Sequence, residues 1–280
     1  MRVLIASEPG RPERDNEDFA AAAPGLLLVV DGAGAPAGVE SGCAHSVSWY
    51  ARNLGGLLLA AASDVALGLD EALAVSIERV NALHATTCDL GHPGSPSATV
   101  ALARVGDGRL EHLVLSDSVL VLDRLDRGPT VITDDRLAEV IARLDEPDGH
   151  SPVGSDEHTG LLRSRVERLA SYRNQSGGFW VASTKPEAAD QALTGSIPLA
   201  ELDAVALLSD GASRLVDRFQ LMTWPDLLGV LRKAGPGELV ARTREAESTD
   251  PDGMRWPRGK ASDDASAVYW AVQDLASPNL

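Results

Sequence analysis

An unbroken apolar run from Leu26 to Val30 constrains the fold of this chain more than any other feature. Strands that face water on one side alternate apolar and polar residues, whereas a continuous apolar run is typical of a strand buried on both faces. The run ends abruptly at Asp31 and Gly32. The sequence therefore predicts a strand that other layers cover on both sides, with a carboxylate at its end.

The rest of the chain alternates between helical and extended patterns. Apolar residues at helical spacing indicate helices over 39–63, 69–88, 135–144, 158–171, 224–233 and 238–248. Extended patterns cover 98–104, 110–115, 119–122, 130–133, 204–208 and 265–272. The first two extended segments flank residues 106–108, whose Gly-Asp-Gly sequence predicts a hairpin turn. With no repeat or linker, we expect residues 1–280 to form a single domain of α+β class, built as a layered sandwich.

The chain carries a strong negative charge. It has 41 Asp and Glu residues against 25 Lys and Arg residues, which gives a formal net charge of −16. Such a field repels phosphates, so we expect no nucleic acid partner, and a site that handles phosphate would need cations of its own. Hydrophobic residues make up 44% of the chain, which is the balance of a soluble globular protein.

The sequence also bears on location. The N-terminal segment turns polar at Ser7, too soon for a signal peptide. The most apolar stretch, residues 54–69, is interrupted by polar residues and is too short to span a bilayer. The chain has only two cysteines, Cys43 and Cys88, which suits a reducing compartment. We therefore expect a cytoplasmic protein without a membrane partner.

Acidic turns adjoin several of the apolar segments. A single Asp-Gly after a strand is usually only a turn, and the cluster at 15–18 alone would suit a solvated loop or a helix cap. Carboxylates gathered at one sheet edge, however, repel one another unless a cation lies between them, and Mg²⁺ or Mn²⁺ takes such oxygen ligands. The acidic segments are 15–18, 31–32, 116–118, 209–211 and 262–264.

In this order, the segments resemble the motifs of the metal-dependent PP2C-type protein phosphatases in their bacterial form. Each motif is short, but the resemblance extends over roughly residues 2–272. The matching segments are Asn16-Glu17-Asp18, Val29 to Gly34, Ser97 to Val100, Leu115 to Ser118, Leu208 to Gly211 and Ser262 to Ser266.

The resemblance implies an α-β-β-α sandwich, in which two antiparallel sheets pack face to face with helices outside. It also implies two Mn²⁺ or Mg²⁺ ions at one end of that sandwich. Asp31 would bridge both ions. Glu17 and the Gly32 carbonyl would bind one ion, and Asp210 with Asp263 would bind the other.

The implied reaction is in-line attack on phosphorus by a water that the two metals share and activate. Asp18 would orient bound water, and an Arg would stabilise the phosphoryl oxygens. The family usually places that Arg four residues before the Glu, where this chain has Glu13. Arg14 is our candidate, because a long guanidinium reaches from a neighbouring position.

Two further departures concern the metal ligands. The final acidic pair of the family is Asp-Asn, whereas this chain has Asp263 and Asp264, and the register favours Asp263 as the ligand. Asp117 matches a position of a weaker third-metal site. The carboxylate that helps to hold that third ion is replaced by Arg214, which makes the third ion doubtful, although Asp217 is near in sequence.

A last departure is Ala33, which stands where some eukaryotic members carry a His that protonates the leaving group. A metal-bound water would replace it. His45 is an alternative, but a single His on a helix is more often structural. We expect Cys43 and Cys88 to be packed thiols inside the helices at 39–63 and 69–88.

The function implied is hydrolysis of phosphoserine and phosphothreonine monoesters in a phosphorylated protein. Two alternatives stay open. The changed Arg position and Ala33 would suit a weak or inactive PP2C-like regulator that binds a partner. The same site chemistry would also serve a phosphatase of a small phosphorylated metabolite. The sequence does not indicate an oligomeric state.

Overall fold

A computed structural model describes residues 1–35, 39–144 and 151–272 of the chain. The strands over these residues are β1 (Val3–Glu8), β2 (Phe19–Ala23), β3 (Leu26–Ala33), β4 (Ser97–Gly106), β5 (Arg109–Leu115), β6 (Val119–Arg124), β7 (Gly128–Ile132), β8 (Leu193–Pro198), β9 (Leu202–Leu208) and β10 (Ala265–Ala271). The α-helices are α1 (Val47–Ala62), α2 (Leu69–His84), α3 (Arg136–Arg143), α4 (Asp156–Ala170), α5 (Asp210–Asp217), α6 (Trp224–Ala234) and α7 (Pro236–Ser248). Two short 3₁₀ helices are η1 (Pro186–Gln191) and η2 (Leu199–Glu201).

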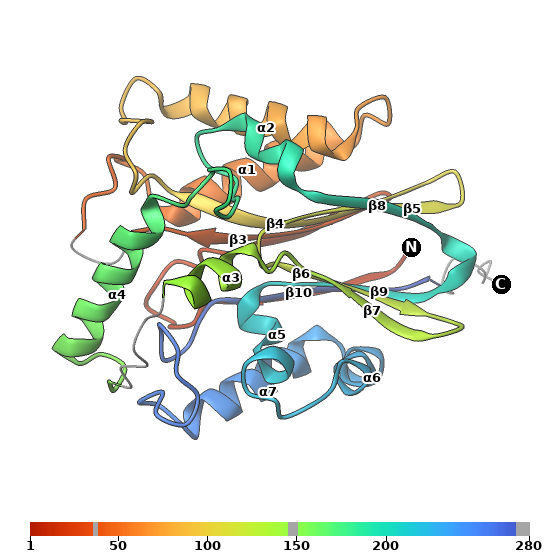
Figure 1. The fold of residues 1–280 in the computed structure, drawn as a ribbon. Coiled ribbons are helices and arrows are strands. Elements are labelled where there is room, and N and C mark those ends of the chain that lie inside the picture. The colour runs from red at the N-terminus through yellow and green to blue at the C-terminus, as the bar shows by residue number, and fades with distance from the viewer. Residues whose placement is uncertain (36–38, 145–150, 273–280) are drawn as a thin grey trace.

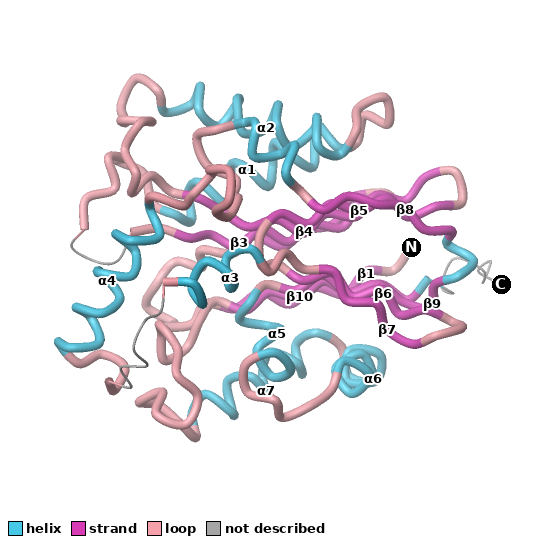
Figure 2. Tube along the Cα trace, in the orientation of Figure 1, coloured by secondary structure: helices cyan, strands magenta, loops and turns pink. Residues whose placement is uncertain are grey.

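The strands form two five-stranded antiparallel sheets. One sheet has the order β1-β10-β9-β6-β7, and the other has the order β2-β3-β4-β5-β8. Figure 1 shows the two sheets face to face, with α1 and α2 outside the second sheet and α5, α6 and α7 outside the first. Figure 2 shows the same four layers by element type. This arrangement confirms the predicted α-β-β-α sandwich.

Strand β3 is buried on both faces, as its apolar run predicts. Leu27 and Val29 point between the sheets, in a core that includes Trp270. Leu28 and Val30 point the other way, into a core shared with α1 and α2. All five of these side chains are fully buried. The strand thus fixes the position of Asp31 at its end.

Helix α1 is shorter than the pattern over 39–63 predicts. It begins only at Val47, where Ser46 caps it by accepting a hydrogen bond from the Trp49 N–H at 3.1 Å. Four glycines and one proline within 32–42 disfavour a helix before that point. Cys43 therefore lies in the loop before α1, and its predicted place inside a helix is wrong.

Helix α2 also ends before the predicted boundary, because its last residue is His84. The β-branched Thr86 and Thr87 that follow have low helix propensity. Cys88 lies in the turn after the helix, so its predicted helical position is wrong too.

The turn at 106–108 joins β4 and β5 as predicted, with Asp107 and Gly108 at φ values of 50° and 70°. Residues 209–211, in contrast, do not form a simple turn, since α5 begins at Asp210. Strand β2 escaped prediction because four of its five residues are alanine, which is depleted in strands. No helix in the described residues combines the length and apolar character needed to cross a membrane.

Candidate metal centre

Carboxylates from four separate elements meet at one end of the sandwich. Asp31 lies in β3, Asp18 directly precedes β2, Asp210 is the first residue of α5, and Asp263 lies two residues before β10. The Asp210 backbone N–H faces an Asp31 carboxylate oxygen, with 3.4 Å between the nitrogen and the oxygen. The structure thus brings together residues that the sequence separates by more than 200 positions.

Two glycines allow the chain segments of this site to approach closely. The Gly32 N–H donates to the Glu17 carbonyl at 3.2 Å, and a Cβ on Gly32 would lie only 2.5 Å from that oxygen. A Cβ on Gly211 would lie 1.9 Å from the Asp264 carbonyl oxygen. Glycine is required at both Asp-Gly steps because any side chain would push the acidic segments apart.

The electrostatics of the site disfavour its carboxylates as bare anions. Burial raises the pKa of Asp31 well above its ordinary value, and the charges of Asp18 and Asp210 add to this effect. Burial raises the pKa of Asp18 to about 7, although the hydroxyls of Ser266 and Ser209 offset part of the rise. Within the described residues, neither Asp18 carboxylate oxygen has a hydrogen-bond partner.

Asp210 shows the same tendency at the open side of the site. Desolvation raises its pKa to about 7, the charge of Asp263 adds to the rise, and Arg214 opposes it. Its side chain nevertheless keeps 42% of its surface accessible, so an ion from solvent can reach the carboxylate.

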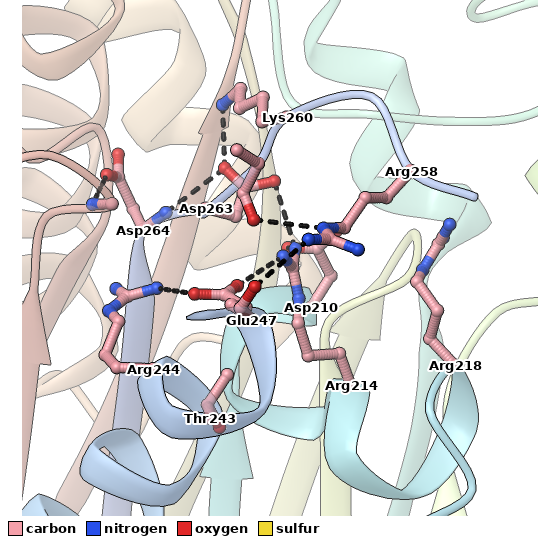
Figure 3. Close-up of polar contacts among 12 residues, drawn as sticks. Asp210, Arg214, Arg218, Thr243, Arg244, Glu247, Arg258, Lys260, Asp263 and Asp264 are labelled. Carbon is pink, nitrogen blue, oxygen red and sulfur yellow. Dashed lines mark hydrogen bonds and ion pairs between the residues drawn. The ribbon is translucent and has the colours of Figure 1, made fainter. Parts of the chain in front are cut away.

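Two cationic side chains lie among these acids (Figure 3). Lys260 places its Nζ 2.8 Å from Asp263 Oδ1 and 3.5 Å from Glu17 Oε2. Arg214 places its Nη2 3.2 Å from Asp263 Oδ2 and 3.7 Å from Asp210 Oδ1. Burial would raise the pKa of Asp263, but Lys260 and Arg214 outweigh it and lower that pKa, so Asp263 is anionic.

Arg214 is held in place by α7. Its Nη1 lies 2.7 Å from Glu247 Oε1, with only 4% and 1% of the two side chains exposed. Arg244 contacts the other Glu247 oxygen at 2.8 Å. A buried guanidinium thus fills the position where the resemblance places a third-metal carboxylate. Asp217 lies exposed at the end of α5.

The carboxylate of Asp264 is engaged with the backbone. Its two oxygens accept hydrogen bonds from the Gly10 and Glu17 N–H groups, each at 2.7 Å. These bonds fasten the loop between β1 and β2, which carries Glu17, to the segment before β10. Asp264 therefore positions the acidic loop, whereas Asp263 faces the other carboxylates.

The two remaining candidates lie further out. Asp117 occupies the turn between β5 and β6, where burial raises its pKa, and its charge adds to the raised pKa of Asp31 and Asp210. Arg14 is exposed on the loop between β1 and β2, where its N–H donates to the Arg11 carbonyl at 3.1 Å.

The residues present fit hard divalent cations. The donors are all oxygens, as Mg²⁺ and Mn²⁺ prefer. Lys260 and Arg214 reach Asp263, Glu17 and Asp210 but leave Asp18 and Asp31 without a contacting cation among the described residues. Divalent ions would supply the missing positive charge.

Sequence reasoning missed Lys260 and Glu247 as parts of this site. Lys260 stands in a polar loop, and Glu247 is one of several charged residues on an amphipathic helix. Nothing in their local pattern distinguishes them from solvated charges. The sequence marks Arg214 as a departure from the family pattern but does not indicate which acidic residues it contacts.

Comparison with known proteins agrees with the fold. Residues 8–239 match the family described as protein phosphatase 2C. The chain therefore belongs to the PP2C family of phosphatases. No curated protein matches the sequence.

Among solved structures, the serine/threonine phosphatase PstP of Mycobacterium tuberculosis is 19% identical, with a TM-score of 0.59 over 96% of this chain and 97% of that one. A catalytic domain of PstP in complex with two manganese ions is 18% identical, with a TM-score of 0.55 over 96% of both chains. Stp1 from Staphylococcus aureus is 14% identical, with a TM-score of 0.54 over 96% of this chain and 94% of that one. At these identities the likeness concerns the fold.

Proposed function

We propose that this chain is a Mn²⁺- or Mg²⁺-dependent phosphatase that hydrolyses phosphoserine and phosphothreonine monoesters in proteins. The observation that carries the proposal is the excess of carboxylate charge gathered at Asp18, Asp31 and Asp210, where desolvation raises the pKa of each group. Such an excess is costly unless cations bind there. PP2C family membership and the manganese complex of the similar PstP domain support the same chemistry.

Each residue of the site has a defined task in this proposal. Asp31, Glu17 and the Gly32 carbonyl would hold one ion, and Asp31, Asp210 and Asp263 would hold the second. When bound, the two ions supply Lewis acidity toward water and neutralise charge on the phosphate.

The other residues would act on water, substrate and loop. Asp18 accepts a hydrogen bond from the attacking water and orients it toward phosphorus. Arg14, on the exposed loop, binds the phosphoryl oxygens of the substrate. Asp264 fixes the loop that carries Glu17 and Arg14 through its two backbone hydrogen bonds. Asp117 would add negative charge that attracts cations to the centre.

The test compares Asp31→Asn and Asp210→Asn with Asp107→Asn as the matched control. Asp107 lies exposed in the β4–β5 turn at a φ of 50°, a conformation that Asn adopts readily. We expect hydrolysis of a phosphothreonine peptide in Mn²⁺ to fall at least about 100-fold in the first two variants, since each loses a charged ligand. The control should keep wild-type activity. Full activity in Asp210→Asn would show that the carboxylate centre does not catalyse the reaction.

One observation favours a second function, that of a PP2C-like regulator that binds a partner without catalysis. Lys260 and Arg214 already pair with Asp263, Glu17 and Asp210, and internal cations of this kind compete with metal ions. Titration calorimetry with Mn²⁺ separates the two functions. Binding in the micromolar to millimolar range that Asp31→Asn abolishes favours the enzyme, and a folded protein without such binding favours the regulator.

A further inference from the structure

A second group of metal-ligating side chains lies away from the carboxylate centre. Cys43 and His45 come from the loop and turn before α1, His84 is the last residue of α2, and Cys88 follows it by four positions. One ligand atom from each residue lies within 4.8 Å of the ligand atoms of the other three.

The three sulfur–nitrogen distances within this cluster are those of a tetrahedral site, and the two sulfurs lie about 0.5 Å closer together than in one. The two Sγ atoms are 3.2 Å apart, and Cys43 Sγ lies 3.4 Å from His84 Nδ1 and 3.7 Å from His45 Nδ1. Cys88 Sγ lies 3.4 Å from His45 Nδ1. Ligands about 2.3 Å (sulfur) and about 2.0 Å (nitrogen) from a tetrahedral Zn²⁺ are separated by about 3.3–3.8 Å. Both cysteines are free thiols, well beyond the roughly 2.05 Å of a disulfide.

Backbone N–H groups point at both sulfurs. The Ala44 N–H donates to Cys88 Sγ at 3.3 Å, and the His45 N–H donates to Cys43 Sγ at 3.4 Å. Burial and the neighbouring Cys88 raise the pKa of the Cys43 thiol, whereas hydrogen bonds from Cys43, Ala44 and Thr87 outweigh burial and lower that of Cys88. The thiolate is the form that binds metals, and a bound cation would favour it at both sulfurs.

The imidazoles are also fixed before any ion binds. Trp49 stacks on His45 with ring centroids 4.1 Å apart and lies 5.3 Å from the ring of His84. His84 is 1% exposed, and its Nδ1 points toward the sulfurs. Beside the cluster, the Asp89 N–H donates to the Gly42 carbonyl at 2.8 Å, which ties the two ligand-bearing loops together.

From this geometry we infer that Cys43, His45, His84 and Cys88 bind one Zn²⁺ through two sulfurs and two Nδ1 atoms. Four protein ligands close the coordination sphere, which is the pattern of a structural zinc site and not of a catalytic one. Two thiolates balance the charge of the ion, and a proton still held by either sulfur passes to solvent on binding. The soft donor set differs from the oxygen ligands of the carboxylate centre, so the two sites select different metals.

The zinc site would cross-link the loop before α1 to the end of α2. That loop connects α1 to the segment after Asp31, at the carboxylate centre. The ion would therefore fasten the start of α1 to the end of α2 in the outer helical layer. Its role is stability, independent of the reaction that the protein carries out.

The test measures metal content and cobalt spectra of four purified proteins. These are the wild type, Cys88→Ser, the ligand-preserving Cys88→His, and Asp31→Asn/Asp210→Asn, which disables the carboxylate centre. We expect about one zinc per chain in the wild type and in the double Asp variant, and a loss of zinc from Cys88→Ser. After replacement by Co²⁺, the wild type should show tetrahedral absorption bands together with thiolate charge-transfer bands. Cys88→His should keep the tetrahedral absorption bands and lose about half of the intensity of the thiolate charge-transfer bands.

A stability measurement completes the design. A zinc chelator should lower the melting temperature of the wild type but leave that of Cys88→Ser unchanged, and His158→Gln, away from the cluster, should respond like the wild type. The inference is overturned if reduced, folded wild type binds neither zinc nor tetrahedral Co²⁺. It is equally overturned if zinc disappears from the double Asp variant, or if the protein purified under reducing conditions holds a Cys43–Cys88 disulfide and no titratable thiol.

Discussion

The pKa of Asp18 makes a measurable prediction about stability. A carboxyl group with a pKa of 3.8 in the unfolded chain and about 7 in the folded one takes up a proton on folding between these values. The folded state therefore loses stability as pH rises from about 4 to about 7, and the loss is complete above pH 7. Asp18→Asn removes this titration and keeps the shape of the side chain.

The expected change in the free energy of unfolding follows from the shift in the pKa of Asp18. Each pKa unit corresponds to about 1.4 kcal/mol, so between pH 5 and pH 8 the Asp18 carboxyl costs the folded state about 3 kcal/mol more. The free energy of unfolding of Asp18→Asn, relative to that of the wild type, should accordingly rise by about 3 kcal/mol between pH 5 and pH 8. Comparing the gain at two pH values cancels any pH-independent effect of the amide on packing.

Urea unfolding in EDTA at both pH values measures this difference. The exposed Asp107→Asn serves as control and should show no pH-dependent gain. Saturating Mn²⁺ should stabilise the wild type, since ligands that bind only the folded state do so. If Asp18→Asn changes the free energy of unfolding by the same amount at pH 5 and at pH 8, the argument that burial raises the pKa of this carboxyl to near neutral pH is refuted.

Two further predictions concern the same site. Gly211→Ala should destabilise the protein by at least about 2 kcal/mol in urea unfolding, because its Cβ would lie 1.9 Å from the Asp264 carbonyl oxygen, and an unchanged midpoint would contradict that packing. Lys260→Met should tighten Mn²⁺ binding about fivefold in calorimetry, because it removes a half-exposed cation, worth about 1 kcal/mol, from Asp263 and Glu17. Weaker binding in that variant would show that Lys260 supports the metal centre.

The layered fold was predictable from β3, because a strand that is buried on both faces has a continuous run of apolar residues in its sequence. The acidic centre was predictable only as an ordered set, since Asp31 and Asp210 each look like ordinary turn residues. No local sequence pattern distinguishes Lys260 and Glu247 from ordinary surface charges. Their roles depend on how α7 and the loop before β10 pack, and local patterns do not encode that packing.

The Cys and His cluster shows the same limit more sharply. Cys43 and Cys88 are 45 positions apart, and the spacing gives no sign that they meet. Their convergence requires α1 and α2 to run antiparallel with nearly equal lengths, and it also requires both helices to stop short of the cysteines. The predicted helices are eight residues too long at the start of α1 and four too long at the end of α2. They therefore place both cysteines inside helices and do not indicate the cluster.

The sheet order has a consequence for how the protein matures. In the described part of the chain, β1 lies at a sheet edge with β10 as its neighbour, so Val3 pairs with Trp270 and Glu8 with Ala265. Asp264, just before β10, also holds the loop that carries Glu17. A nascent chain on the ribosome therefore has no complete acidic centre until residues 264–271 have emerged. In the proposed phosphatase, binding of both metal ions would therefore follow synthesis of β10.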